Sequence, residues 1–146
     1  MTYVGQSVRR FEDHRLLTGQ GSYVDDMKLP GLLNAVVLRS LHAHATIRSI
    51  DVSGANRLPG VVAVITAADI QDLDVHMPTR SSIDDVELTP PRHPVLASDK
   101  VCYVGQAVAL IIAEDPYTAA DALEQVLVDY EVLPAVTDPY QAMEEG

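Results

Sequence analysis

The side chains best suited to chemistry are two histidines separated by one residue, His42 and His44. On a strand, residues i and i+2 face the same side, an arrangement that metal sites use. A zinc site needs a third and usually a fourth ligand, and His14, His76 and His93 lie far away in the sequence. We therefore interpret His42 and His44 as structural or solvent-facing side chains in a turn between two strands.

Two pairs of adjacent carboxylates, Asp25–Asp26 and Asp84–Asp85, are candidates for acid–base chemistry. Adjacent residues of an extended chain point to opposite faces, so neither pair converges on one substrate by itself. Charged side chains are mostly exposed, and solvated loop carboxylates are the interpretation that we favour.

The single cysteine, Cys102, cannot form an internal disulfide or a thiolate cage around a metal. Its only basic neighbour is Lys100, which predicts an inert, half-buried thiol in a strand. The segment Gly19-Gln20-Gly21 is too short for a dinucleotide fingerprint and predicts a bend. These motifs alone assemble no active site.

The elements that must position these side chains are several strands and short helices. Apolar runs predict strands at residues 32–40, 45–52, 61–66, 100–103, 107–113 and 127–132. Helical segments are predicted at 53–58 with Ser53 as N-cap, at 67–70, after Asp115 as N-cap with Pro116 at the first position, and at 138–143. The third of these carries an apolar stripe of Ala119, Ala120, Leu123, Val126 and Leu127. Strands and helices alternate without a regular βαβ rhythm, so we predict an α+β fold.

Two segments lack this periodicity. Residues 1–27 predict an extended N-terminal arm attached to a domain at 28–146. Residues 71–94 contain four prolines and several carboxylates, which predicts a mobile segment within that domain.

Composition narrows the class of protein. The chain has 146 residues, 47% apolar and 21% charged, a balance typical of one globular domain. A formal net charge of −11 repels phosphate backbones, so we expect no nucleic-acid partner. No apolar run approaches the ~18 residues of a membrane span, and the first residues do not resemble a signal peptide. We expect a cytoplasmic protein.

Short motifs follow one another along the chain in a fixed order. They are Gly5-Gln6-Ser7-Val8-Arg9-Arg10-Phe11, Thr18-Gly19-Gln20-Gly21-Ser22-Tyr23, Leu29-Pro30-Gly31, Arg39-Ser40, His42-Ala43-His44-Ala45, Pro59-Gly60-Val61, Asp99-Lys100-Val101, Tyr103-Val104-Gly105-Gln106-Ala107 and Tyr130-Glu131-Val132-Leu133-Pro134. This series resembles the start of the large, molybdopterin-binding subunit of the xanthine dehydrogenase family, which includes aldehyde oxidases and aerobic carbon monoxide dehydrogenases. One departure is Leu41, where members often carry proline, and this loosens the expected turn.

The resemblance implies an α/β hammerhead domain, an α+β unit with a mixed sheet and a few short helices. It implies that the complete subunit is an oxidoreductase that hydroxylates a carbon centre with oxygen from water. The cofactor of that subunit would be a molybdopterin, with the cytosine dinucleotide form expected. Electrons would pass to 2Fe-2S clusters and FAD on an iron–sulfur small subunit and a flavin medium subunit, which with the remainder of the large subunit are the expected partners.

No residue of this chain matches the catalytic, cofactor-binding or metal-binding motifs of the family, so we assign none of these roles. We expect the isolated chain to be inactive and to bind no molybdenum, iron or zinc. The resemblance places Thr89, Pro90 and Pro91 near the substrate entrance of the full enzyme. From Met1 and Gly146 we expect the N-terminal fragment of a separate large subunit. The alternative is a stand-alone binding or interaction module on the same fold.

Overall fold

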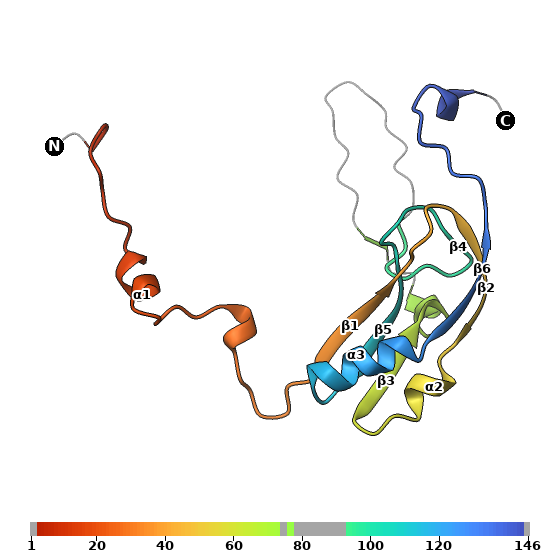
Figure 1. Cartoon of the computed structure of the whole chain (residues 1–146), viewed down its shortest axis with the longest axis horizontal. Coiled ribbons are helices and arrows are strands. Elements are labelled where there is room, and N and C mark those ends of the chain that lie inside the picture. The colour runs from red at the N-terminus through yellow and green to blue at the C-terminus, as the bar shows by residue number, and fades with distance from the viewer. Residues whose placement is uncertain (1–2, 74–75, 78–92, 145–146) are drawn as a thin grey trace. The chain divides into compact units, whose positions relative to one another are not determined.

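The computed structural model describes residues 3–73, 76–77 and 93–144 (Figure 1). The chain divides into two units, Met1–Leu32 and Leu33–Gly146, and each is described here by itself. The predicted boundary after residue 27 lies inside the first unit.

The first unit contains two short helices that we did not predict. They are α1 (Asp13–Leu17) and the 3-10 helix η1 (Val24–Asp26), which interrupt the predicted extended arm or loop at two places. A carboxylate near the start of α1 explains it, because Asp13 Oδ2 accepts a hydrogen bond from the Arg10 N–H at 3.0 Å. Neither helix buries a residue, so local hydrogen bonds rather than an apolar core support them.

Three strands of the second unit form a sheet that we name sheet A. Its order is β1-β5-β3, with β1 (Asn34–Arg39), β5 (Ala107–Ala113) and β3 (Val61–Thr66) pairing antiparallel (Figure 1). The strands predicted at 32–40, 61–66 and 107–113 are confirmed, with trimmed ends at the first. Central strand β5 contains fully buried Val108, Ala109, Ile111 and Ala113, which explains its continuous apolar run.

The other three strands form sheet B, with the order β4-β2-β6. They are β4 (Lys100–Val101), β2 (Ala45–Asp51) and β6 (Leu127–Val132), again antiparallel. The register of β2 shifts between Ile47 and Ser49, and this bulge explains why the apolar alternation of the sequence slips at Ile50. The strand predicted at 100–103 was too long, because Cys102 and Tyr103 already belong to the turn that follows β4.

The α+β class is confirmed, and the expected mixed sheet is replaced by two antiparallel sheets. The connections give the reason. Helix α3 (Pro116–Glu124) carries the chain from β5 of sheet A to β6 of sheet B, so this crossover does not create a parallel pair within one sheet. The short helix α2 (Ser53–Asn56) likewise joins β2 of sheet B to β3 of sheet A.

Of the two helix N-caps predicted from the sequence, Asp115 is confirmed and Ser53 is not. Asp115 caps α3 as predicted, accepting hydrogen bonds from the N–H groups of Tyr117 at 2.8 Å and Thr118 at 2.9 Å. Ser53 is not the N-cap of α2, because its N–H donates to Asp51 Oδ1 at 2.9 Å and Val52 occupies the cap position. The remaining helices are η2 (Ala67–Leu73), which extends three residues into the segment expected to be irregular, and η3 (Gln141–Met143).

Two groups of buried apolar side chains hold the unit together. The first lies between the sheets and contains Ala45, Ile47, Ala97, Val101 and Val108. The second contains Ala55, Ile111, Ala122 and Val126 and joins sheet A to α2 and α3. Helix α3 buries Ala119 and Ala122. The predicted stripe members Ala120 and Leu127 are exposed, and Leu127 belongs to β6. Alanine at both buried positions lets the helix approach the sheet closely.

No helix in the described part of the chain is long and apolar enough to cross a membrane.

Candidate functional site

Sequence motifs that are far apart in the chain meet at one end of the second unit. The loop after β1 and the turn before β5 are joined there by backbone hydrogen bonds. The Ser40 N–H donates to the Gln106 carbonyl at 2.9 Å, and the Gly105 N–H donates to the Ser40 carbonyl at 2.8 Å. Arg39 Nη1 adds a bond to the Gly105 carbonyl at 2.9 Å. Gly105 has φ of 90°, a conformation that only glycine adopts without strain.

Two buried polar side chains fix this junction. Gln106 is 5% exposed, and its Oε1 accepts a hydrogen bond from the Cys102 N–H at 2.7 Å. Ser40 is 1% exposed, and its Oγ accepts from the His42 N–H at 3.0 Å and donates to the His42 carbonyl at 2.9 Å. These hydrogen bonds satisfy backbone groups inside the loops, so both side chains have a structural role.

The two histidines have different partners. The His42 ring packs edge-on against Tyr130, with ring centroids 4.9 Å apart. His44 Nδ1 lies 2.8 Å from the Pro134 carbonyl, which only accepts, so this nitrogen donates. Burial raises the pKa of Tyr130, and the side chain of Ser40 opposes this in part. The interpretation of the pair as structural agrees with these contacts, and the described residues contain no group of three potential metal ligands.

A cavity of about 460 Å³ lies beside this junction, lined by His44, Cys102, Tyr103, Val104 and the segment Pro134–Thr137. Cys102 is exposed, so the prediction of a half-buried thiol was wrong. The reason is that β4 ends one residue earlier and the chain turns outward at Cys102.

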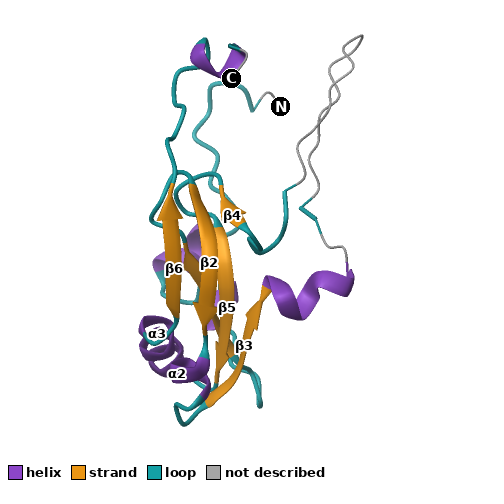
Figure 2. Cartoon of the chain, turned by 90° about the vertical axis from the view of Figure 1, so that its right-hand side faces the viewer, coloured by secondary structure: helices purple, strands orange, loops and turns teal. Residues whose placement is uncertain are grey.

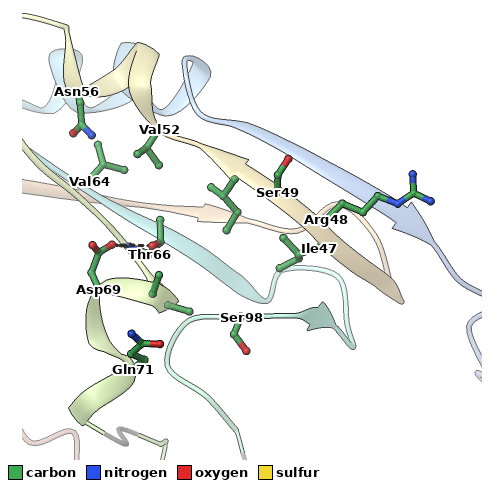
Figure 3. Close-up of a pocket in the computed structure, with 13 residues that line it drawn as sticks. Ile47, Arg48, Ser49, Val52, Asn56, Val64, Thr66, Asp69, Gln71 and Ser98 are labelled. Atoms are coloured by element: carbon green, nitrogen blue, oxygen red, sulfur yellow. Dashed lines mark hydrogen bonds between the residues drawn. The ribbon is translucent and has the colours of Figure 1, made fainter.

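A second cavity, of about 510 Å³, lies between β2 and the end of β3 (Figure 3). Its charged groups are already engaged. Asp69 Oδ2 accepts from the N–H and Oγ1 of Thr66 at 2.7 and 2.8 Å, and these bonds lower the pKa of Asp69. Arg48 pairs with Glu131 at 3.2 Å. The rest of the lining combines hydroxyl and amide side chains with apolar ones. The polar residues include Ser49, Asn56, Gln71 and Ser98, and the apolar residues include Ile47, Val52 and Val64. This lining suits binding and provides no nucleophile with an adjacent base.

Asp26 lines neither of these two cavities. Asp26 Oδ2 accepts from the Tyr23 N–H at 2.9 Å and thereby caps η1. Asp84–Asp85 and the predicted entrance residues Thr89, Pro90 and Pro91 lie outside the described residues.

A helix N-terminus is a common binding site for phosphate groups, which a pterin dinucleotide carries, and α3 provides a test. Asp115 occupies the N–H groups of its first turn, and hydrogen bonds from Thr118 and Tyr117 lower the pKa of Asp115. The N-terminus of α3 therefore does not fit the phosphates of a pterin dinucleotide, and we derive no chemical step through that cofactor.

Sequence reasoning missed the roles of Thr66 with Asp69 and of Gln106. The first pair has a recognisable signal, the spacing Thr-x-x-Asp at the end of a strand, which is typical of a helix cap. Gln106 has none, because only the fold shows that its side chain is buried beside Cys102.

Two antiparallel sheets linked by short helices define an α+β domain. The chain belongs to the family described as aldehyde oxidase and xanthine dehydrogenase, a/b hammerhead domain, whose model matches residues 18–134. The predicted family and fold are confirmed.

Individual relatives agree with this assignment. The chain is 51% identical over 142 residues to the carbon monoxide dehydrogenase large chain of Afipia carboxidovorans, a match of 97% of this chain and 17% of that relative. It is 43% identical over 149 residues to the 6-hydroxypseudooxynicotine dehydrogenase complex subunit gamma of Paenarthrobacter nicotinovorans, covering 97% of this chain and 18% of the relative.

Solved structures give the same result. The crystal structure of Cu,Mo-CO dehydrogenase has a TM-score of 0.84 at 51% identity, covering 96% of this chain and 17% of that one. Quinoline 2-oxidoreductase from Pseudomonas putida 86 has a TM-score of 0.85 at 42% identity, covering 96% and 18%. The chain thus spans only 17–18% of the length of these relatives.

Proposed function

We propose that this chain serves as the N-terminal scaffolding domain of a molybdenum hydroxylase large subunit. The complete enzyme would be an oxidoreductase that hydroxylates a carbon centre with oxygen from water. The observation that carries this proposal is the match of 97% of the chain to 17% of a carbon monoxide dehydrogenase large chain. The chemistry belongs to the other parts of such a subunit, since the charged groups of the described cavities are engaged in capping and pairing.

The cofactor and partners form the finer part of this proposal. The complete subunit would bind molybdopterin, in the cytosine dinucleotide form, outside this domain. Electrons would leave through 2Fe-2S clusters and FAD on a small and a medium subunit in the cytoplasm. Relatives named as a large chain and as a subunit gamma of a dehydrogenase complex support a multi-subunit assembly.

Within that enzyme, Thr89, Pro90 and Pro91 would lie near the substrate entrance. Thr89→Ala in a complete subunit should raise KM and leave kcat within about twofold, because an entrance residue affects access rather than the reacting atoms. An unchanged KM would contradict this placement.

Co-expression tests the main proposal. The Afipia carboxidovorans large chain would be produced without the part that aligns with this chain over 142 residues. This shortened large chain would be expressed with and without the present chain. We expect the two polypeptides to co-purify and the shortened large chain to be soluble only when this chain is present. The isolated chain should show no turnover of aldehydes or purines with an electron-accepting dye.

The alternative, a stand-alone binding module, is favoured by one observation, the cavity lined by hydroxyls and amides beside β3. Two results would support it over the scaffold: no co-purification with the shortened large chain, and a highly stable monomer of the isolated chain by sedimentation and thermal unfolding.

A further inference from the structure

Among the described residues, strand β3 has an open edge that differs from most edges of soluble sheets. It is the last strand of sheet A, and among the described residues no strand pairs with its outer side (Figure 2). Proteins usually protect such edges with charges, prolines or bulges. The sequence of β3, Val61–Thr66, contains no charge and no proline, and its only irregularity lies at its start, between Val61 and Ala63.

The backbone of β3 presents hydrogen-bonding groups on this open side. The Thr66 N–H is bound by the Asp69 carboxylate, so it points away from β5. Backbone groups alternate in direction along an antiparallel strand, so the N–H and carbonyl of Val64 point to the same open side. Ile65, between them, directs its backbone groups toward β5.

A cavity lies on each side of this edge. Val64 and Thr66 face the cavity of about 510 Å³ with its hydroxyls and amides (Figure 3). Ile65 faces a second cavity, about 320 Å³, that is lined only by apolar residues, among them Val37 and Leu110. Val37, Leu110 and Ile65 form one row across sheet A. Side chains of an added strand would alternate between these two cavities, because successive side chains of a strand point to opposite faces.

We propose that the open edge of β3 binds an extended segment of the remainder of the large subunit as a fourth strand of sheet A. This segment would alternate apolar residues, which enter the cavity beside Ile65, with polar residues, which meet the hydroxyls and amides of the other cavity. Main-chain hydrogen bonds supply affinity in this mode and the paired pockets supply specificity. The inference rests on the proposed function.

The remainder of the large subunit is a better occupant than a second copy of this chain. The relatives continue far beyond the matched part, which is 17–18% of their length. A segment of the same polypeptide pairs at an effective concentration on the order of millimolar. A second copy must pay the full cost of association between two molecules.

Hydrogen exchange at single residues tests this pairing. The complex of this chain with the shortened Afipia carboxidovorans large chain would be compared with the chain alone. We expect the Val64 amide to exchange at least about tenfold more slowly in the complex, because it gains a hydrogen bond on the open side. The Ile65 amide, which faces β5, should be slow in both samples and is the internal control.

A pair of proline variants gives a second test. Val64→Pro removes a donor on the open side of β3, and we expect about a tenfold or larger loss of co-purified complex. The matched control is Val132→Pro on the outer edge of β6. The Leu133 N–H donates to the His44 carbonyl at 2.9 Å, so the N–H of Val132 points outward in the same way. This control should retain the complex within about twofold.

Each outcome decides between the proposals. If wild-type chain does not co-purify, the proposed function and this inference both fail. If it co-purifies with an unprotected Val64 amide, the inference alone is wrong. Concentration-dependent protection of Val64 in the isolated chain would indicate a second copy and overturn the choice of occupant. If Val64→Pro does not fold on its own, as judged by circular dichroism, the hydrogen-exchange comparison alone decides.

Discussion

The buried amide of Gln106 connects a sequence motif to the stability of the fold. Its Oε1 accepts the Cys102 N–H at 2.7 Å, and the residue is 5% exposed. Gln106→Met keeps a similar volume and removes this acceptor, leaving a partly buried N–H without its partner. A donor left unsatisfied in this way costs about 1–3 kcal/mol. We expect the free energy of unfolding to fall by that amount.

Urea unfolding of the isolated chain, followed by far-ultraviolet circular dichroism, measures this change as a lower midpoint at constant slope. In a domain of this size each kcal/mol lowers the Tm by about 4 °C, so the thermal transition should fall by roughly 4–12 °C. The matched control is Gln141→Met, because Gln141 is exposed, and its effect should stay within about 0.5 kcal/mol.

Equal midpoints for Gln106→Met and Gln141→Met would refute the reasoning. That result would show that water or another group satisfies the Cys102 N–H as well as the Gln106 side chain does. A gain in stability would show that apolar packing outweighs the hydrogen bond at this position.

Three further predictions concern packing, pH and metals. Gly54→Ala would bring a Cβ within 2.9 Å of the Gln125 carbonyl oxygen. This clash with the backbone should exceed the gain in helix propensity, so we expect the free energy of unfolding to fall by about 1–2 kcal/mol in the same urea assay. A more stable variant would contradict the close approach of α2 to the end of α3. Hydrogen bonds from Thr118 and Tyr117 lower the pKa of Asp115 below its ordinary value. The Asp115 carboxylate therefore stabilises the folded chain above about pH 4, and this stabilisation is lost as the pH falls further. Asp115→Asn should reduce the dependence of the Tm on acid pH, and an unchanged dependence would show that other carboxylates control it. Metal analysis of the purified chain should find no stoichiometric molybdenum, iron or zinc, whereas one metal per chain that is lost in a His42→Ala, His44→Ala variant would contradict the structural interpretation of the pair.

Much of the secondary structure follows from local chemistry. Continuous apolar runs predicted β3 and β5, and the Asp115-Pro116 pair predicted the start of α3, because strand packing and helix capping act over a few residues. The same reasoning failed for Ser53, because α2 begins one residue earlier than predicted: Val52 is the N-cap, and the Ser53 N–H is already bound by Asp51. It also failed for the N-terminal arm, where a local carboxylate supports α1.

The sequence by itself determined the family, through an ordered series of motifs, and the α+β class, through the types and lengths of its apolar runs. Only the tertiary structure decided that the strands form two antiparallel sheets and that Gln106 and Ser40 are buried beside each other's loops. It also decided that, in the part of the chain that the structure describes, β3 has an open edge between two cavities. Each of these depends on contacts between residues far apart in the chain, such as Ser40 with Gln106 and Val37 with Leu110. Local propensity does not predict such contacts. Each of them closes a long loop, and the conformational entropy lost on closure is offset only by the packing of the whole domain.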